Sequence, residues 1–316
     1  MLRHYLQWHI IHSCNLHCVH CYQEDYNCRM PYEQMVATLD KYEAYVRAKG
    51  YEGQINLTGG EPMLHPDFYR ICEEIRRRGL RLGILTNGTL IDENASNKLA
   101  ALKPVFVQIS LDGPQKVHDL IRGEGNFQRA VAGIDHLKSA GVRVLVSFTI
   151  MKQNCETFRE VARVCAKHHV DKLWWDRVVT DDESQYLTTE EFRKASETAS
   201  RLSKKYDFIN NGRALQWIPE DNCGYECSAG KRLLIILANG DMMACRRLPF
   251  VIGNIYRVDD LDSFLEENET MKMLRKPRFP KECVGCKYFY KCGGGSLCVT
   301  YAQTGKLGIR DVNCYL

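Results

Sequence analysis

Three cysteines close to the start of the chain, Cys14, Cys18 and Cys21, have the spacing expected of ligands to one metal centre. Three thiolates on a short loop can hold three irons of a cubane [4Fe–4S] cluster and leave the fourth iron without a protein ligand. That open iron can bind a small molecule. Zinc is the alternative metal, but structural zinc sites usually combine CxxC pairs into four ligands. The CxxxCxxC spacing therefore favours an iron–sulfur cluster with one open position.

Eight further cysteines crowd the last third of the chain. Their spacing is C-x3-C, then a single cysteine, then C-x2-C-x5-C-x5-C and a final cysteine near the C-terminus. Eight thiolates can fill two four-cysteine clusters, although two zinc sites would use the same CxxC pairs. The remaining four cysteines, Cys28, Cys72, Cys155 and Cys165, fit neither array. The eight are Cys223, Cys227, Cys245, Cys283, Cys286, Cys292, Cys298 and Cys314.

The elements that position these residues follow a βα repeat up to about residue 206. Six βα units predict an α/β fold with a parallel sheet and favour a partial (β/α)6 TIM-like barrel over a full eight-unit barrel. We expect the barrel in residues 1–206, a bridge in 207–222 and a small cysteine-rich domain with a β-hairpin in 223–316. The predicted strands are Tyr5–Ile11, Gln54–Thr58, Arg81–Thr86, Val105–Leu111, Val142–Ile150 and Lys172–Val178.

The unusual residues follow the predicted strands. The cysteine run comes after the first strand, Gly59-Gly60-Glu61-Pro62 comes after the second, and Ser110 closes the fourth. In a βα barrel the loops after the strands line one mouth, where active sites lie. Two glycines let the backbone pass close to a ligand, and the glutamate supplies an acceptor. We therefore expect these motifs to meet at one rim of the barrel.

Together, the CxxxCxxC run, the GGEP tetrad and the C-terminal cysteine array resemble radical S-adenosylmethionine (SAM) enzymes with a SPASM extension. The resemblance covers essentially the whole chain. It implies that SAM chelates the open iron and that the GGEP segment binds the methionyl ammonium. The bidentate fork of Arg122 makes it either a partner of the methionyl carboxylate or a surface arginine in a loop. The candidate SAM-binding residues are Gly59, Gly60, Glu61, Pro62, Ser110, Arg122 and His20.

The same resemblance divides the eight C-terminal cysteines into two auxiliary [4Fe–4S] clusters, which makes three clusters in all. Five residues separate Cys292 from Cys298, where the family usually has three, so the ligation of Cys298 stays open. The implied ligands are Cys223, Cys227, Cys245 and Cys298 for auxiliary cluster I, and Cys283, Cys286, Cys292 and Cys314 for auxiliary cluster II.

The resemblance implies cleavage of SAM to a 5′-deoxyadenosyl radical that takes a hydrogen atom from a substrate. A ribosomally made peptide is the expected substrate, with a thioether, a carbon–carbon crosslink or another oxidative modification as the product. Three alternatives remain: a peptide epimerase with Cys223 as hydrogen donor, a small-molecule dehydrogenase, and a non-enzymatic electron carrier, which the GGEP loop argues against. Arg246 stands where formylglycine-forming maturases have an aspartate base. Asp176 and Arg177 are candidate substrate contacts.

Composition narrows the cellular setting. The formal net charge of +4 is mild and indicates no nucleic-acid partner. No apolar run spans a membrane and no signal peptide is recognisable, so we expect a cytoplasmic protein whose cysteines bind metal. The expected partners are a peptide substrate and a flavodoxin- or ferredoxin-type electron donor. Since the first strand begins almost at Met1, a leader peptide would need a separate leader-peptide-binding protein or would dock directly on the barrel.

Overall fold

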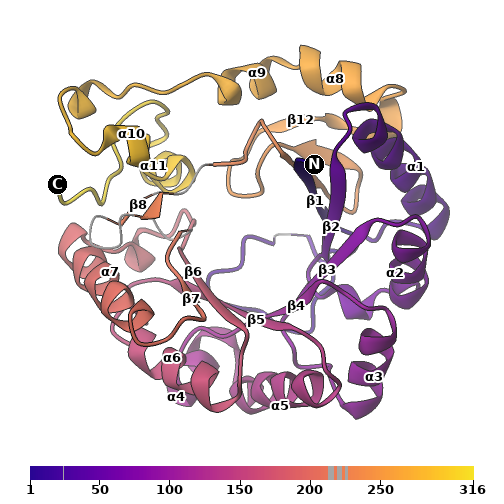
Figure 1. The fold of residues 1–316 in the computed structure, drawn as a ribbon, viewed down its shortest axis with the longest axis horizontal. Coiled ribbons are helices and arrows are strands. Elements are labelled where there is room, and N and C mark those ends of the chain that lie inside the picture. The colour runs from indigo at the N-terminus through magenta and orange to yellow at the C-terminus, as the bar shows by residue number, and fades with distance from the viewer. Residues whose placement is uncertain (24, 213–216, 219–222, 225–226) are drawn as a thin grey trace.

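One curved sheet of ten strands forms the frame of the protein. The structure is a computed structural model and describes residues 1–23, 25–212, 217–218, 223–224 and 227–316. The strand order is β12-β11-β10-β1-β2-β3-β4-β5-β6-β7, and the two outer strands do not pair with each other. The sheet therefore curves into an open barrel, with helices around its outside (Figure 1). The predicted incomplete barrel is confirmed.

Within the described residues, seven parallel strands and seven helices build the barrel wall. Neighbouring strands pair in parallel from β1 to β7, so their carboxyl ends share one edge, which we call the mouth. The strands are β1 Arg3–His9, β2 Glu52–Thr58, β3 Arg81–Thr86, β4 Phe106–Ser110, β5 Val144–Ile150, β6 Lys172–Arg177 and the short β7 Ile209–Asn210. The helices are α1 Tyr32–Ala48, α2 Phe68–Arg77, α3 Glu93–Ala101, α4 Gln115–Arg122, α5 Asn126–Ser139, α6 Phe158–Lys167 and α7 Thr189–Ser203.

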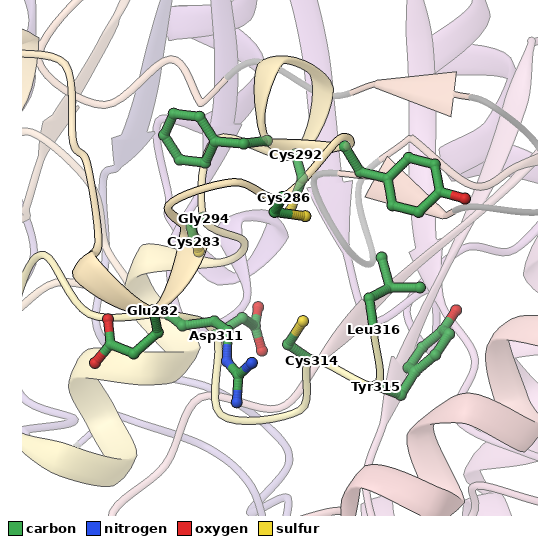
Figure 2. Close-up of a pocket in the computed structure, with 12 residues that line it drawn as sticks. Glu282, Cys283, Cys286, Cys292, Gly294, Asp311, Cys314, Tyr315 and Leu316 are labelled. Atoms are coloured by element: carbon green, nitrogen blue, oxygen red, sulfur yellow. The ribbon is translucent and has the colours of Figure 1, made fainter.

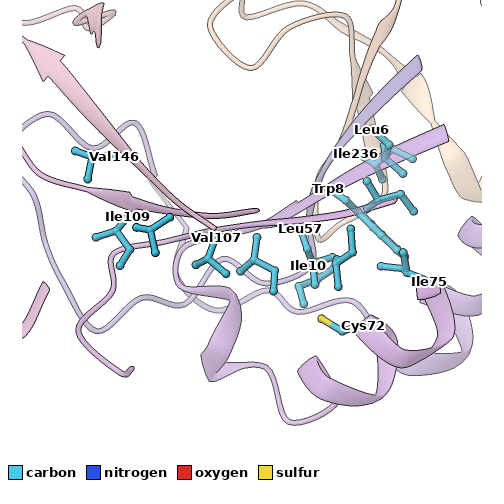
Figure 3. Packing of buried hydrophobic residues seen from close by; sticks show 14 of the residues in the cluster. Leu6, Trp8, Ile10, Leu57, Cys72, Ile75, Val107, Ile109, Val146 and Ile236 are labelled. Carbon is cyan, nitrogen blue, oxygen red and sulfur yellow. The ribbon is translucent and has the colours of Figure 1, made fainter. Parts of the chain in front are cut away.

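The strands alternate between an apolar outer side and a polar inner side. Leu6, Trp8 and Leu57 belong to the buried core between sheet and helices (Figure 3). The intervening residues Gln7 and Asn56, which pair across β1 and β2, are only half-buried. Since side chains of a strand alternate between its two faces, these polar groups face the inside of the barrel. The barrel interior is therefore a polar space beneath the mouth.

The cysteine-rich part of the chain extends the same sheet. Its hairpin consists of β10 Leu233–Ile236 and β11 Asp241–Met243, which turn at Gly240 as the sequence predicts. The structure adds β12 Val251–Asn254 beside β11, and it pairs β10 with β1 in parallel. That parallel pairing was not predicted. It follows from apolar burial, because Leu234 and Ile236 join the same core as Leu6 and Trp8.

Several short elements complete the C-terminal part. Asp260 and Asn268 cap α8 Leu261–Glu267 and α9 Glu269–Arg275, which sequence reasoning missed although both are favoured N-cap residues. Among the described residues, no helix has the length and apolar character to cross a bilayer. The other elements are β8 Trp217–Ile218, β9 Cys223–Gly224, α10 Phe289–Cys292 and α11 Leu297–Thr304.

Candidate functional site

The N-terminal cysteine loop, which holds Cys14, Cys18 and Cys21, lies at the mouth between β1 and α1. Burial raises the pKa of the Cys14 thiol to about 11, and the charges of Glu61 and the other two cysteines add to the increase. Burial also raises the pKa of Cys18, with Cys21 contributing and Arg122 opposing. A cationic metal centre would suit the buried Cys14 and Cys18 thiols, because it takes up their negative charge as it displaces their protons.

Backbone amides already point at the sulfur atoms. The amide of Leu16 donates to Cys14 Sγ, and the amide of Gln23 donates to Cys21 Sγ, each at 3.4 Å. In both cases the donor lies two residues after the cysteine. Hydrogen bonds to sulfur stabilise the thiolate and help to set the potential of an iron–sulfur cluster. The loop therefore fits a thiolate-bound cluster.

The spacing of the thiols bears on which metal centre they suit. A single zinc ion needs its ligands to converge on one point, with zinc–sulfur distances of about 2.3 Å. Among the residues that the structure describes, no three His, Cys, Asp or Glu side chains converge in that way. A cubane cluster is larger, because its ligands bind separate irons. The CxxxCxxC spacing remains the reason to prefer a cluster to mononuclear zinc at this loop.

The GGEP segment fits tightly against the cysteine loop. A Cβ atom on Gly59 would lie 2.3 Å from the Ile11 carbonyl oxygen, and one on Gly60 would lie 2.3 Å from the carbonyl oxygens of His12 and Ser13. The amide of Gly60 also donates to the Ile11 carbonyl at 2.7 Å. The close approach that requires these glycines is therefore to the backbone leading into Cys14. The sequence alone had suggested only that these glycines let the backbone pass close to a ligand.

Glu61 has partners that the sequence did not reveal. Its side chain is fully buried, and its two oxygens accept hydrogen bonds from the Thr86 hydroxyl at 2.8 and 2.9 Å. They also accept from the amides of Asn87 at 2.9 Å and Met63 at 3.2 Å. Burial raises the pKa of Glu61 to about 7 against these hydrogen bonds. Through these hydrogen bonds the Glu61 side chain connects the loop after β2 to the loop after β3, in addition to any contact with SAM.

A buried charge network stands on the other side of the cysteine loop. Arg122 at the end of α4 donates to Asp112 Oδ2 at 2.6 Å and to Cys18 Sγ at 3.6 Å. It also lies 3.4 Å from His20 Nε2. Burial lowers the pKa of His20 to about 4, so its imidazole is neutral at neutral pH. Asp112, which lies two residues after β4 and is fully buried, was missed as a site residue.

The other two predicted SAM-binding residues also lie at the mouth. Ser110 is the last residue of β4, is half-buried, and pairs in register with Ser147 of β5. Pro62 is buried and begins a short 3-10 helix, Pro62–Leu64, after β2. The mouth therefore brings together every predicted SAM-binding residue, and their contacts with SAM stay predictions.

The cluster I set, Cys227, Cys245 and Cys298, comes together from three separate segments. The charges of Cys227 and Cys298 act on Cys245, whose pKa burial raises to about 12. The amide of Arg247 donates to Cys245 Sγ at 3.4 Å, as in the N-terminal loop. The charge of Cys298 thus acts on Cys245 despite the two extra residues before Cys298, and its ligation of a cluster stays a prediction. Cys223 begins β9, but its side chain lies outside the described residues.

The cluster II set lines one pocket close to the C-terminus. Its members come from the loop before α10, from α10 itself and from the end of the chain (Figure 2). Burial raises the pKa of Cys292 to about 11, with contributions from Asp311, Cys314 and Cys283. The set consists of Cys283, Cys286, Cys292 and Cys314.

Two arginines after the hairpin connect the cluster I set to the mouth. Arg247 donates to Asp176 Oδ2 at 3.0 Å, which places the acid at the end of β6 beside the cysteines. Arg246 lies over the Tyr22 ring at 4.2 Å and donates to the Tyr22 carbonyl at 3.4 Å. Tyr22 directly follows Cys21, so this stack links the N-terminal cysteine loop to the hairpin. Asp176 thus keeps a place at the mouth as a candidate substrate contact.

Arg177 is a correction to the sequence-based prediction. It follows Asp176 on β6 and lies on the opposite, helix-facing side, where its guanidinium sits 4.4 Å above the Phe192 ring of α7. It donates to both oxygens of Asp311 at 2.8 and 2.6 Å and to Asn313 at 2.7 Å. Arg177 therefore anchors the C-terminal segment and does not face a substrate in the mouth.

The chain belongs to the radical SAM superfamily, because the model of that family matches residues 8–166. A second family model, that of the SPASM iron–sulfur cluster-binding domain, matches residues 227–287. The protein is therefore a radical SAM enzyme that uses SAM and iron–sulfur clusters. The resemblance inferred from the cysteines and the GGEP tetrad is confirmed.

Relatives and solved structures extend this likeness over nearly the whole chain. Mycofactocin maturase MftC of Mycolicibacterium smegmatis is 27% identical over 342 residues, which cover 98% of this chain and 82% of that protein. An AdoMet-dependent heme synthase of Nitratidesulfovibrio vulgaris is 25% identical over 320 residues, which cover 92% of this chain and 86% of that protein.

Among solved structures, native anSMEcpe with bound AdoMet superposes with a TM-score of 0.81 at 18% identity, over 98% of this chain and 93% of that chain. Streptococcus suis SuiB bound to precursor peptide SuiA gives a TM-score of 0.76 at 18% identity, over 100% of this chain and 76% of that chain. At these identities the structures show the shared fold.

Proposed function

We propose that this enzyme is a peptide maturase, which removes a hydrogen atom from a ribosomally made peptide and leaves it oxidatively modified. The observation that carries the proposal is the joining of the two cysteine regions at one mouth. The Arg246–Tyr22 stack and the Arg247–Asp176 pair bring the cluster I set beside the N-terminal cysteine loop. A substrate held there contacts both regions, as an oxidation requires. The names of MftC and SuiB with its precursor peptide support a peptide substrate.

SAM on an N-terminal [4Fe–4S] cluster would supply the 5′-deoxyadenosyl radical, and two auxiliary clusters would complete the set of three. The residues of this chain have three tasks around that chemistry. Cys14, Cys18 and Cys21 would hold the cluster, while Asp112 orients Arg122 toward Cys18, where its guanidinium would meet the SAM carboxylate. The half-buried polar side chains inside the barrel would hold the peptide backbone near the mouth.

The residues at the end of the hairpin reduce the number of peptide modifications that this enzyme can be expected to catalyse. Arg246 occupies the place after Cys245 and stacks on Tyr22, so no carboxylate base is available at that position. This argues against formylglycine formation. The gathering of Cys298 with Cys227 and Cys245 favours an auxiliary cluster I over a free hydrogen-donating thiol. Crosslink formation or another oxidative modification is therefore preferred to epimerisation through Cys223.

The test is the iron and sulfide content of anaerobically reconstituted protein together with its products. We expect about twelve irons, falling to about eight when Cys14, Cys18 and Cys21 are changed to alanine. The wild-type protein should form 5′-deoxyadenosine with dithionite, and a co-encoded precursor peptide should lose hydrogen mass in the same reaction. About eight irons with deuterium uptake from solvent at a peptide Cα would instead establish the epimerase.

A further inference from the structure

Arg246, which follows Cys245 at the end of the hairpin, has no acidic partner among the residues that the structure describes. Its guanidinium donates to the Tyr22 carbonyl at 3.4 Å and lies 4.2 Å above the Tyr22 ring. Three other arginines near the cysteine sets each donate to an aspartate. These pairs are Arg122 with Asp112, Arg247 with Asp176 and Arg177 with Asp311. In the described part of the chain, the charge of Arg246 is therefore left without a counter-charge.

The guanidinium of Arg246 also has hydrogen-bond donors that are not used. An arginine has five N–H groups and no acceptor. The Nε atom of Arg246 is buried and has no hydrogen-bond partner within the described residues. A buried donor without an acceptor costs free energy, and a bound group with two acceptor oxygens can remove that cost. A carboxylate is such a group, and it also supplies the missing negative charge.

The neighbouring His9 shows the same surplus of donors. The Gln7 amide nitrogen lies 3.1 Å from His9 Nε2, and an amide nitrogen only donates, so Nε2 accepts and the neutral ring carries its hydrogen on Nδ1. That Nδ1 atom is buried without a hydrogen-bond partner. Burial lowers the pKa of His9 to about 3, the nearby charge of Arg246 adds to the decrease, and the Gly59 carbonyl has a smaller, opposite effect. His9 therefore adds a donor beside Arg246 and no negative charge.

The acidic side chains on this side of the mouth do not offset the surplus. Asp176 already has Arg247 as its partner at 3.0 Å. Asp25 lies 3.5 Å from His12 Nδ1 and is largely exposed. We call the group formed by Gln7, His9, Tyr22 and Arg246 the Arg246 corner. It lies between the N-terminal cysteine loop and the hairpin, which is where the proposed function places the substrate.

The charge at position 246 determines which chemical group can lie there. Formylglycine-forming maturases have an aspartate base at this position, and a base takes a proton from a neutral side chain. An arginine stays protonated and cannot act as a base. Its planar, cationic fork is suited to holding a carboxylate through two parallel hydrogen bonds. The reversal of charge at this position thus favours a substrate group that is itself negatively charged.

We infer that the Arg246 corner binds a carboxylate of the substrate peptide, either that of an aspartate or glutamate side chain or that of the C-terminus. The inference rests on the proposed peptide substrate and adds the chemical group that this side of the mouth recognises. Arg246 makes the contact, and no covalent bond changes. His9 is 1% exposed, so it makes no contact with the peptide and only surrounds Arg246 with further donors.

The experiment measures binding of the fluorescently labelled, co-encoded precursor peptide to reconstituted full-length protein with SAM, by fluorescence anisotropy. Arg246→Gln should weaken binding about 10- to 100-fold, because the charge-assisted hydrogen bonds are lost. Arg246→Lys keeps the charge without the fork and should restore part of the affinity. The matched control is Arg159→Gln, which changes an exposed arginine of α6 on the outside of the barrel and should leave binding within about twofold of wild type.

Two series of peptides distinguish the sources of the carboxylate. One has the C-terminal carboxylate replaced by an amide, and the other has each aspartate or glutamate replaced by asparagine or glutamine. The peptide that lacks the bound carboxylate should bind wild-type protein about 10- to 100-fold more weakly. The same peptide should bind Arg246→Gln no more weakly than the unmodified peptide does, because the interaction is already lost in that variant.

Two results would overturn the inference. Binding that is unchanged in Arg246→Gln would show that this arginine contacts no peptide. A loss in Arg246→Gln that is equally large for every neutralised peptide would show that Arg246 acts through its stack on Tyr22 and not through a carboxylate.

A probe that is not a peptide separates this inference from the proposed function. With SAM present, 4-fluorobenzoate should show a broadened fluorine NMR signal with wild-type protein and Arg159→Gln, whereas Arg246→Gln should leave the signal sharp. The neutral analogue 4-fluorobenzamide should stay sharp with all three proteins. Failure of the wild type to bind or modify any peptide would count against the proposed function, and the carboxylate site would still stand on the 4-fluorobenzoate result. A signal that is equally sharp in the wild type and in Arg246→Gln would remove the carboxylate site itself.

Discussion

The N-terminal cysteine loop and the region around the cluster II set are supported in different ways. The N-terminal loop follows β1 and lies beside the ends of β2 and β3. The hydrogen bonds between these strands and their buried apolar side chains support the loop without any metal. The cluster II region consists of short turns: the 3-10 turn Lys281–Cys283 and α10 bury no residue of their own. A segment without a core has little to offset the entropy of ordering its chain. From this comparison we expect the first region to bind metal on a scaffold that is already ordered, and the second to become ordered by the metal that it would bind.

The largest effect should come from the N-terminal loop. Changing Cys14, Cys18 and Cys21 to alanine removes every protein ligand of the SAM-binding cluster, so 5′-deoxyadenosine formation should fall by at least about 1,000-fold. The thermal unfolding midpoint should change little, because the surrounding sheet does not depend on these thiols. A matched variant, Cys72→Ala, changes a buried core thiol and should keep the activity while lowering the midpoint. Activity that survives in the triple variant would refute the assignment.

Iron removal should separate the two regions. In the metal-free chain, amide hydrogen exchange should stay slow in β1 to β6 and become fast in residues 277–296, because metal binding supplies the folding free energy of small cysteine-rich segments. The measurement is hydrogen exchange by mass spectrometry before and after chelation. Slow exchange throughout residues 277–296 without iron would contradict the comparison.

The Arg177–Asp311 pair joins β6 of the barrel to the C-terminal segment and should be costly to break. Both side chains are 2% exposed, so Arg177→Met leaves a buried carboxylate without its cation, at a cost of about 3–5 kcal/mol in the free energy of unfolding. The control is Arg193→Met, which removes an arginine paired with Glu190 at the surface and should cost under about 1 kcal/mol. Urea unfolding of the reconstituted proteins gives both values. Equal costs would mean that the C-terminal segment is held by other contacts.

The smallest effect concerns the pH dependence of Glu61. The carboxyl group loses its proton near pH 4.5 in the unfolded chain, whereas burial raises the pKa to about 7 in the folded chain. Between these values the folded state binds more protons, so the free energy of unfolding falls as pH rises. Glu61→Gln should remove about 2 kcal/mol of that fall between about pH 5.5 and about pH 7.5.

Urea unfolding of the metal-free chain at several pH values measures this difference. Glu93→Gln at the start of α3 is the control, because Glu93 is exposed and should leave the pH dependence unchanged. A Glu61→Gln curve parallel to that of the wild type would show that the buried carboxylate does not titrate in this range.

Local signals were sufficient for the barrel and the motifs. Strands such as Arg81–Thr86 have an apolar run bounded by turn residues, so their positions were predictable to within a few residues. The GGEP tetrad and the N-terminal loop were expected at one rim, and parallel pairing places them there. By contrast, α8 and α9 were missed in a polar stretch, although Asp260 and Asn268 were visible caps.

The sequence by itself determined the chemistry: thiolates at CxxxCxxC spacing, glycines before Glu61 and eight further cysteines depend only on covalent order. Only the tertiary structure decided which distant residues are in contact. The pairing of β10 with β1, the partners of Glu61 and the placement of Arg177 against Asp311 join segments far apart in the chain. Such contacts are selected by burial of the whole chain at once, since the cost of an unpaired buried charge or an exposed apolar face appears only when distant segments come together.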